Sequence, residues 1–465
     1  MLNKNFEFRL FTFVYAYFLV IIFNGYMIKE RLVFYFKISL IAIIFLICSI
    51  KVCMAQTFDN SFGRDLIYDD KNYISTIKTV LFYKKGFELN PPIFSINTDE
   101  SLILEFDDLD NTTKEYYFTI IHCNSDWKPS QLDQSAYIDG FNQDVITKSD
   151  FSFNTLVSYI HYQLEFPNEQ MKPTHSGNFI LKIFDNQNPE QPVITRRFLV
   201  VEPKLNILAT VKPSSNVEDR ESKQEIDFTI EHPNFEIFNP FGDLKVVIMQ
   251  NNRWDNAITE LKPLFVKDHV LVYDYAEEAT FDGNNEYRYF DAKSLRYRTE
   301  QIKSIEFDSS CYQFYLQNEL MKTYKMYSIL NDINGKFLVK NDEASDKNTE
   351  SDYINVHFSL VSPSPVIGGN FYVFGDLSYN QCAEDFKLVY NKKTSLYERN
   401  ILLKQGYYNY VYAFLDDKNR IPDLTLSEGN HFETGNNYSI LVYYKSISDY
   451  GDRLIGYKSF NSNNR

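Results

Sequence analysis

A histidine, a cysteine and an aspartate lie within five residues of one another in HCNSDWKPSQLDQSAYIDGF (122–141), and a tryptophan follows. These residue types can form a nucleophile–base pair or hold a metal ion. His122 and Cys123, however, end an apolar run with strand character, YYFTIIHC, and adjacent strand residues point to opposite faces. They therefore cannot form a catalytic dyad with each other. The sequence contains no HExxH, GxSxG, CxxC or Walker phosphate-loop motif, so we predict no catalytic residues and no enzymatic activity.

Turns rich in acids and amides are the other candidates for ion binding. DDLDN (107–111) offers oxygens that could hold calcium, but apolar runs flank it, which favours a solvated hairpin turn. NDINGK (331–336) has an incomplete calcium-loop spacing, and its Asn-Gly pair is a strong hairpin signal. FDGNNEYRYFD (281–291) could be a ligand loop, with a polar connection between strands as the default. We predict no metal ion and no cofactor.

Three cysteines, Cys123, Cys311 and Cys382, lie beyond the N-terminal apolar region. Their spacings are far too long for a zinc knuckle. We expect them to be small buried hydrophobic side chains, and one disulfide among them stays open.

The segment after Cys123 is predicted to be a long ordered loop. Asp126 can cap a turn at Lys128-Pro129 through its side chain, and Trp127 adds a large apolar surface with one N–H donor. Two interpretations stay open: Trp127 packs over the end of its own sandwich, or the loop docks on a partner protein. For the second interpretation the candidate partner-binding residues are Trp127, Pro129, Tyr137 and Phe141.

The elements that must position these residues are strands. Two-residue alternation recurs along the chain while helical periodicity is scarce, and 35 Tyr and 40 Phe against 16 Gly and 15 Pro also favour strands. Strand patterns occur in FILKIF (179–184), VITRRFLVVE (193–202), LKVVIMQ (244–250), YINVHFSL (353–360) and YSILVYYK (438–445). YERNILLKQGYYNYVYAFLDD (397–417) predicts two strands that reverse at Gln405-Gly406. The fold class is therefore predicted to be all-β, with tandem immunoglobulin-like β-sandwich modules after a cleaved N-terminal signal segment.

Composition divides the mature chain into three modules. KPSSNVEDRESKQ (212–224) is polar, and KNDEASDKNTESD (340–352) is acidic and poor in apolar residues, as expected of an exposed linker. The predicted modules are an N-terminal β-sandwich (56–205), a middle β module (206–345) and a C-terminal immunoglobulin-like β-sandwich (350–465).

Residues 1–55 are predicted to be a signal segment. KISLIAIIFLICSI (37–50) has signal-peptide length, basic residues precede it, and VCMAQ (52–56) ends in small residues. We therefore place the cleavage between Ala55 and Gln56. Lipidation at Cys48 or Cys53 is less favoured, because neither is preceded by the small residues that usually mark such a cysteine.

An earlier apolar run, LFTFVYAYFLVIIF (10–23), has two interpretations. It is either a first membrane helix or, as we prefer, part of a region upstream of the true start at Met27. In the second case residues 1–26 are not translated.

The mature chain is strongly acidic. The full sequence has 47 basic and 62 acidic residues; without the six basic and two acidic residues of 1–55, 41 and 60 remain, a net charge of −19. Such a surface repels nucleic acid and anionic lipid headgroups. It suits an exported protein or one with a basic partner.

Several long stretches resemble one known family. They are the opening segment (122–141), FSFNTLVSYIHYQLEFPNE (151–169), SGNFILKIF (176–184), TRRFLVVEP (195–203), FDGNNEYRYFDAKSLR (281–296), NFYVFGDLSYN (370–380), LYERNILLKQGYYNY (396–410) and EGNHFETGNNYSILVYY (428–444). Together they resemble the plug protein of the type IX secretion system over nearly the whole mature chain. The motifs are long and ordered but are not catalytic signatures, so they identify membership rather than a site.

The resemblance implies a non-enzymatic periplasmic protein at the inner face of the outer membrane. Relatives bind the large outer-membrane β-barrel translocon from the periplasmic side and close its pore when no substrate is exported. The expected partner is that translocon; no nucleic acid and no small-molecule substrate is expected, and membrane contact is expected only through the translocon.

Two other functions are weighed against this one. NFYVFGDLSYN and YERNILLKQGYYNYVYAF resemble starch-binding immunoglobulin-like modules, which makes a carbohydrate-binding accessory protein of the envelope the main alternative. Those modules stack sugars on tryptophan, and here Trp127 and Trp254 both lie outside 350–465. A metal-dependent hydrolase is the least favoured alternative.

Overall fold

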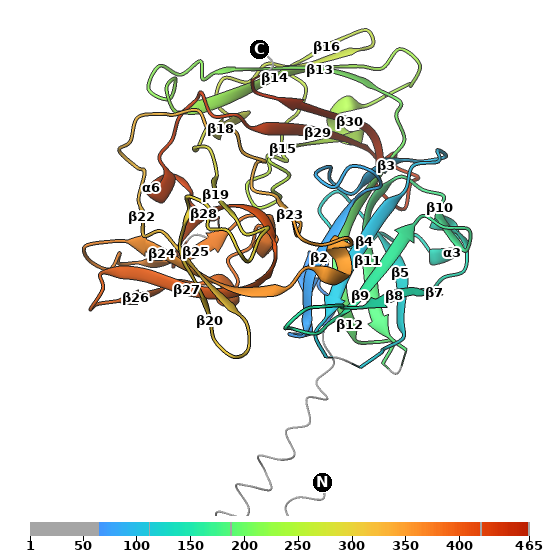
Figure 1. Cartoon of the computed structure of the whole chain (residues 1–465). Coiled ribbons are helices and arrows are strands. Elements are labelled where there is room, and N and C mark those ends of the chain that lie inside the picture. Colours follow the sequence, from blue (N-terminus) through green and yellow to red (C-terminus); the bar gives the residue numbers. More distant parts are fainter. Residues whose placement is uncertain (1–64, 111, 187, 419–420, 464–465) are drawn as a thin grey trace, which may run out of the picture. The chain divides into compact units, whose positions relative to one another are not determined.

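The computed structural model describes residues 65–110, 112–186, 188–418 and 421–463 (Figure 1). The predicted signal segment, with Ala55 and Gln56, lies outside the described residues. Strands dominate the described chain, whose helices are single turns, so the prediction of an all-β fold built from β-sandwiches is confirmed. Over these residues no helix is long and apolar enough to span a bilayer.

The first sandwich packs two sheets around an aromatic core. One sheet has the order β1 (Lys71–Asn72), β12 (Pro192–Val201), β11 (Gly177–Asp185), β5 (Tyr116–Cys123) and β7 (Asp144–Val145), with β3 (Ile93–Ser95) parallel to β12. The other contains β2 (Ile77–Lys84), β4 (Leu102–Asp108), β9 (Ile160–Phe166) and β8 (Lys148–Phe151). The turn α3 (Gln134–Tyr137) leads into β6 (Ile138–Gly140), which pairs with β10 (Met171–Pro173). In the core, the ring of Phe198 lies 5.4 Å from that of Phe166 and 5.2 Å from that of Phe179, between centroids.

The second sandwich is built from a five-stranded and a three-stranded sheet. The first contains β13 (Asn206–Pro213), β14 (Lys223–Glu231), β17 (Val270–Tyr273) and β16 (Phe265–Lys267), with β18 (Thr280–Asp282) also on β14. The second contains β15 (Leu244–Gln250), β29 (Asn437–Tyr444) and β30 (Arg453–Asn461), and α4 (Pro240–Asp243) precedes β15. Both sheets contribute apolar residues to a single core.

The third sandwich encloses a core rich in tyrosine. Its larger sheet contains β20 (Ile302–Phe307), β21 (Tyr312–Leu316), β24 (Tyr353–Val361), β27 (Leu396–Lys404) and β26 (Val389–Asn391), with β22 (Glu319–Leu320) also on β24. The facing sheet contains β19 (Arg288–Asp291), β28 (Gly406–Asp416), β23 (Phe337–Val339) and β25 (Gly369–Phe374). The remaining turns are α5 (Lys347–Glu350), α6 (Thr425–Glu428), η1 (Asp376–Ser378) and η2 (Glu384–Phe386).

The strands of the second and third sandwiches do not follow one another along the chain. The C-terminal hairpin β29–β30 joins β15 in the second sandwich, where Leu441 lies opposite Val247. In turn, β19, β20 and β21 come from the predicted middle module but pack into the third core. The predicted division into 206–345 and 350–465 therefore does not separate the two cores. The physical reason is that β15 needs a long apolar strand beside it, which the YSILVYY run of β29 supplies.

The reversal predicted at Gln405-Gly406 is present, but it does not make a hairpin. β27 pairs with β24 and β26, whereas β28 pairs with β19, β23 and β25, so the chain crosses here from one sheet to the other. Gly406 permits the crossing, because a Cβ there would lie 2.2 Å from the carbonyl oxygen of Leu338. The expected aromatic face of the second strand is confirmed: Tyr408, Tyr410, Tyr412 and Phe414 are all buried in the third core.

A fourth apolar cluster joins the first sandwich to the second. Ile180 and Leu199, on β11 and β12, pack with Val247 of β15 and Leu441 of β29. The sheets that carry these strands are therefore buried on both faces. This explains why β12 and β29 read as nearly continuous apolar runs rather than as strict alternation.

Candidate functional site

The opening segment forms a tight turn at the end of β5. The backbone N–H of Trp127 donates to the carbonyl oxygen of Asn124 at 2.9 Å, and that of Asn124 to the carbonyl oxygen of Lys128 at 2.8 Å. The carboxylate of Asp126 accepts from the backbone N–H of Lys128 at 3.1 Å, which confirms the predicted cap. Trp127 has a φ of 63°, so the turn holds its backbone in the left-handed conformation that L residues seldom adopt.

Two of the four candidate partner-binding residues are not at the surface. Trp127 is 7% exposed and Tyr137 is 5% exposed, so neither ring is available to a partner. Tyr137 packs against His122 and Phe179 of its own sandwich, with centroids 5.8 and 6.0 Å away. Pro129 is exposed, and Phe141 is 63% exposed. The partner-binding role stays a prediction for Pro129 and Phe141 and is corrected for Trp127 and Tyr137.

Trp127 instead belongs to the junction between the first and second sandwiches. Its ring meets Trp254 edge to face with centroids 5.0 Å apart. The guanidinium of Arg197 lies 4.4 Å from the Trp127 centroid and is held by the carbonyl oxygen of Tyr68. The packing therefore bridges two sandwiches, where the sequence suggested the end of one. Sequence alone missed Trp254 as a partner, because the contact spans two modules.

His122 and Cys123 point to opposite faces of β5, as predicted. His122 packs edge to face on Phe179, and its Nε2 lies 3.2 Å from the carbonyl oxygen of Ser176. Cys123 packs in the cluster between sandwiches. Burial lowers the pKa of His122 to about 4 and raises the pKa of the Cys123 thiol to about 12. At neutral pH the pair therefore presents a neutral imidazole and a protonated thiol on separate faces.

The first and third sandwiches meet at a buried cluster of charges centred on Asp107. Its carboxylate accepts from Nζ of Lys404 at 2.7 Å and from the hydroxyl of Tyr353 at 2.7 Å, and lies 2.8 Å from Nδ1 of His161. Lys404 also lies over the ring of Tyr159 at 4.0 Å. Burial acts to raise the pKa of Asp107, but the charge of Lys404 and the bond to His161 hold it below its usual value. The oxygens that a calcium ion would need at 107 are thus already engaged.

The segment predicted to be an exposed linker, 340–352, takes part in the same junction. Asp352 is 4% exposed, and its carboxylate accepts from the backbone N–H groups of Leu156 at 2.8 Å and Val157 at 3.1 Å. The hydroxyl of Tyr159 donates to the carbonyl oxygen of Ser351 at 2.8 Å. The prediction is therefore wrong for the end of this segment, whose polar side chains satisfy backbone groups of the first sandwich.

The motif at 281–291, considered above as a ligand loop, instead binds the motif that begins at Glu428. Asn284 and Asn285 bond to residues 428–434, including a 2.8 Å bond from Asn285 Nδ2 to the carbonyl oxygen of Glu428. Arg288 donates from Nε to both carboxylate oxygens of Glu428 at 2.9 Å. A Cβ at Gly283 would lie 2.0 Å from the carbonyl oxygen of His431. These motifs therefore hold the second and third sandwiches together.

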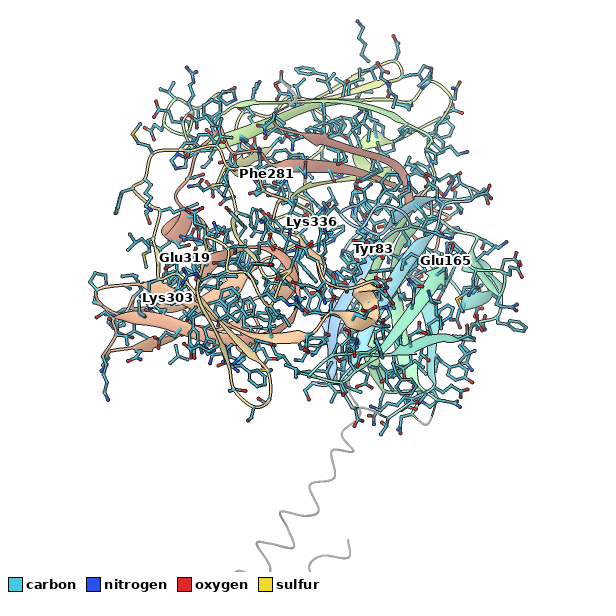
Figure 2. The ribbon with its side chains drawn as sticks, viewed as in Figure 1. Tyr83, Glu165, Phe281, Lys303, Glu319 and Lys336 are labelled. Atoms are coloured by element: carbon cyan, nitrogen blue, oxygen red, sulfur yellow. The ribbon has the colours of Figure 1, made fainter. Side chains whose placement is uncertain are left out.

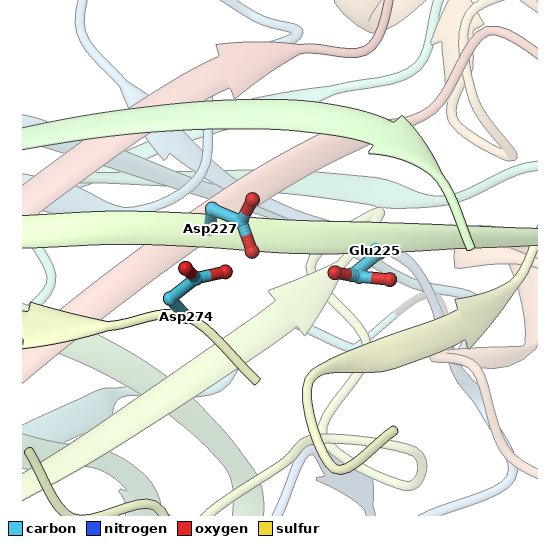
Figure 3. A group of neighbouring side chains, drawn as sticks. All are labelled: Glu225, Asp227 and Asp274. Carbon is cyan, nitrogen blue, oxygen red and sulfur yellow. The ribbon is translucent and has the colours of Figure 1, made fainter. Parts of the chain in front are cut away.

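One acidic cluster among the described residues has the spacing of a metal site. Glu225, Asp227 and Asp274 gather on the second sandwich with one oxygen of each within 4.8 Å of the others (Figure 3). Nζ of Lys212 lies 3.0 Å from Glu225, 2.5 Å from Asp227 and 3.8 Å from Asp274. The ammonium group thus takes the place that a metal ion would need. The cysteines are free thiols at all three described positions.

Two of the three comparisons with known proteins found a match. A family model described as "Type 9 secretion system plug protein 1st domain" matches residues 77–202, which correspond to most of the first sandwich. The crystal structure of a hypothetical protein from Parabacteroides merdae is 32% identical, with a TM-score of 0.83. The match covers 85% of this chain and 100% of that one. No curated protein matches the chain.

The family model matches part of the first sandwich, whereas the structural match covers 85% of the chain and so extends beyond that sandwich. The structural match covers the whole length of the crystallised protein and shows that the two proteins share their arrangement of strands. The family model assigns the first sandwich to the plug protein family. We conclude that the chain belongs to the plug protein family of the type IX secretion system, and so has a role in type IX secretion.

Proposed function

We propose that the protein is a non-enzymatic plug that binds the periplasmic side of the outer-membrane translocon and closes its pore when no substrate is exported. The observation that carries this proposal is the family match over residues 77–202. The proposal includes a periplasmic location at the inner face of the outer membrane.

The contacts between sandwiches support the proposed plug, because they make the protein stiff. The Trp127–Trp254 contact joins the first sandwich to the second, the Asp107 cluster joins the first to the third, and the Arg288–Glu428 bonds tie the third to the segment that leads into β29. The first two contacts bury side chains from two sandwiches, and the third fixes the chain that passes from the third sandwich back to the second, so the sandwiches resist moving separately. A wide pore is better closed by such a body than by domains on flexible linkers.

The two tryptophans of the chain do not support the carbohydrate-binding alternative. Trp127 is buried, and Trp254 is partly buried and meets it edge to face. The buried indole of Trp127 therefore presents no open face on which a sugar ring could stack, and that of Trp254 is partly covered.

Deleting the gene is expected to leave type IX secretion running while the envelope becomes leaky. A stopper does no transport work, so its loss leaves the translocon open to the periplasm. Periplasmic proteins should appear in the medium, and bulky antibiotics should enter more easily. Immunoblots of periplasmic markers in the medium and growth inhibition by a large antibiotic measure the two effects, with the wild-type gene on a plasmid as the control.

Two results of the deletion would contradict the plug. Complete loss of secretion with an impermeable envelope would instead indicate a motor or an assembly factor. Normal secretion and normal permeability, with lost growth on a glycan, would favour the carbohydrate-binding alternative.

A further inference from the structure

The segment between β22 and β23 displays large apolar side chains directly to solvent. Tyr324 is 99% exposed, Met326 is 92% exposed and Ile329 is 79% exposed. Single exposed apolar residues are common on folded proteins and need no explanation. Three such residues within six positions, each almost fully exposed, are a different case because the fold gains nothing from them.

Hydrogen bonds at Lys322, Thr323 and Tyr327 anchor the first part of this segment. The backbone N–H of Lys322 donates to the carbonyl oxygen of Ser427 at 2.6 Å, and the hydroxyl of Thr323 bonds to the carbonyl oxygen of Leu426. Further along, the hydroxyl of Tyr327 donates to the carboxylate of Glu286 at 2.6 Å. Tyr324 and Met326 lie between these anchors and point to solvent, and Ile329 follows two residues after the last one, so the stretch that carries the first two side chains is already ordered. A docking loop of this kind loses little conformational entropy on binding.

The charge of the segment is opposite to that of the protein. From 320 to 331 the sequence LMKTYKMYSILN has two lysines and no acid, although the mature chain has a net charge of −19. Lys322 points inward to Glu428, with Nζ 3.7 Å from the carboxylate, while Lys325 is exposed between Tyr324 and Met326. Figure 2 labels Glu319 of β22, the acidic residue that directly precedes this segment. Tyr and Met are also enriched in protein interfaces.

We propose that residues 320–329 form a docking loop that seats in an apolar groove, rimmed by carboxylates, on the translocon. Tyr324, Met326 and Ile329 fill the groove, and Lys325 meets the acidic rim. The loop deepens the proposed function and rests on it, since the partner is the same translocon. A protein groove is favoured over a lipid surface because an extended anionic membrane would face and repel the acidic remainder of the molecule, whereas a groove faces only the loop with its exposed lysine.

The test compares three forms of the full-length exported protein. The loop variant is Tyr324→Ser/Met326→Ser/Ile329→Ser. The matched control is Tyr297→Ser/Ile367→Ser/Val389→Ser, which changes side chains that are 73%, 94% and 64% exposed on the same sandwich. Each form is tagged, immobilised and presented with a detergent extract of envelopes from the deletion strain. The translocon barrel is identified in the eluate by mass spectrometry and its affinity is measured by titration.

The loop variant is expected to bind the barrel about tenfold more weakly or worse, as for loss of an interface hot spot. The control should bind like the wild type, and all three forms should unfold alike because the changed residues are exposed. If the loop variant binds normally, the docking loop is overturned while the plug function stands. If the wild type captures no barrel, the plug function itself fails and the docking loop with it.

A second measurement distinguishes lipid from protein. Flotation with protein-free vesicles of phosphatidylethanolamine and phosphatidylglycerol should leave the wild type unbound. Vesicle binding that the loop variant loses would overturn the protein groove in favour of a membrane surface. Lys325→Glu should weaken capture of the barrel, and the difference from the wild type should shrink as salt is raised, because exposed charges are screened.

Discussion

Replacing Lys404 with methionine is expected to lower the free energy of unfolding by about 3–5 kcal/mol, since it leaves the carboxylate of Asp107 buried without its cation. Both residues are 1% exposed, so water cannot replace the lost partner. Chemical denaturation followed by circular dichroism measures the change. The effect should be large because the ion pair joins β4 of the first sandwich to β27 of the third.

A double variant separates charge from packing. Lys404→Met combined with Asp107→Asn removes both charges of the pair, and asparagine keeps an acceptor for Tyr353. The double variant should therefore recover part of the stability lost by Lys404→Met alone, which is the coupling that a double-mutant cycle measures. Equal stability of the single and double variants would show that the buried charge is not the cause.

The same pair predicts a dependence on pH. The pKa of Asp107 is lowered in the folded protein, so its contribution to stability is fully present above the pKa of an unfolded aspartate, about 4, and is lost as the pH falls through the folded value. In Lys404→Met the carboxyl can take up a proton at a higher pH. The difference in the free energy of unfolding between wild type and variant should therefore be largest near neutral pH. It should decrease as the pH falls toward and below about 4.

The strands were predictable because their pattern is local. LKVVIMQ forms β15 over the predicted residues, and the alternation in YINVHFSL matches β24, with Ile354 and Val356 in the core. The sandwich boundaries were not predictable, since composition along the chain says nothing about β29 returning to β15. A pairing over that distance depends on which apolar faces remain uncovered after the other strands have paired.

The candidate site shows the same limit. The cap made by Asp126 was predictable from residues two positions apart. The burial of Trp127 was not, because it depends on Trp254 and Arg197 from other elements. The acidic segment at 340–352 was misjudged for the same reason: Asp352 is a polar residue whose partners are backbone N–H groups of another sandwich. Composition can show that such a residue is polar but not that a buried backbone needs it.

The second large effect on the free energy of unfolding is expected at Trp127, which lies between two sandwiches. Trp127→Ala should lower the free energy of unfolding by about 3–5 kcal/mol, as for other buried tryptophans. The ring contacts both Trp254 and Arg197, so its loss leaves a cavity between the first and second sandwiches. Trp127→Phe is the matched control and should cost less, because it keeps an aromatic ring. Among the described residues the indole N–H of Trp127 has no hydrogen-bond partner to lose.

Intrinsic tryptophan fluorescence can be used to follow the junction between the first and second sandwiches. The chain has two tryptophans, and both lie in this contact, so intrinsic fluorescence reports on it directly. In Trp127→Ala the remaining emission comes from Trp254, which should shift to longer wavelength as its neighbour is removed and water approaches. An unchanged unfolding curve with an unchanged Trp254 emission would contradict the bridging role. Normal stability with lost binding to the translocon would instead restore Trp127 as a docking residue, which requires the turn at 124–128 to open when the partner binds.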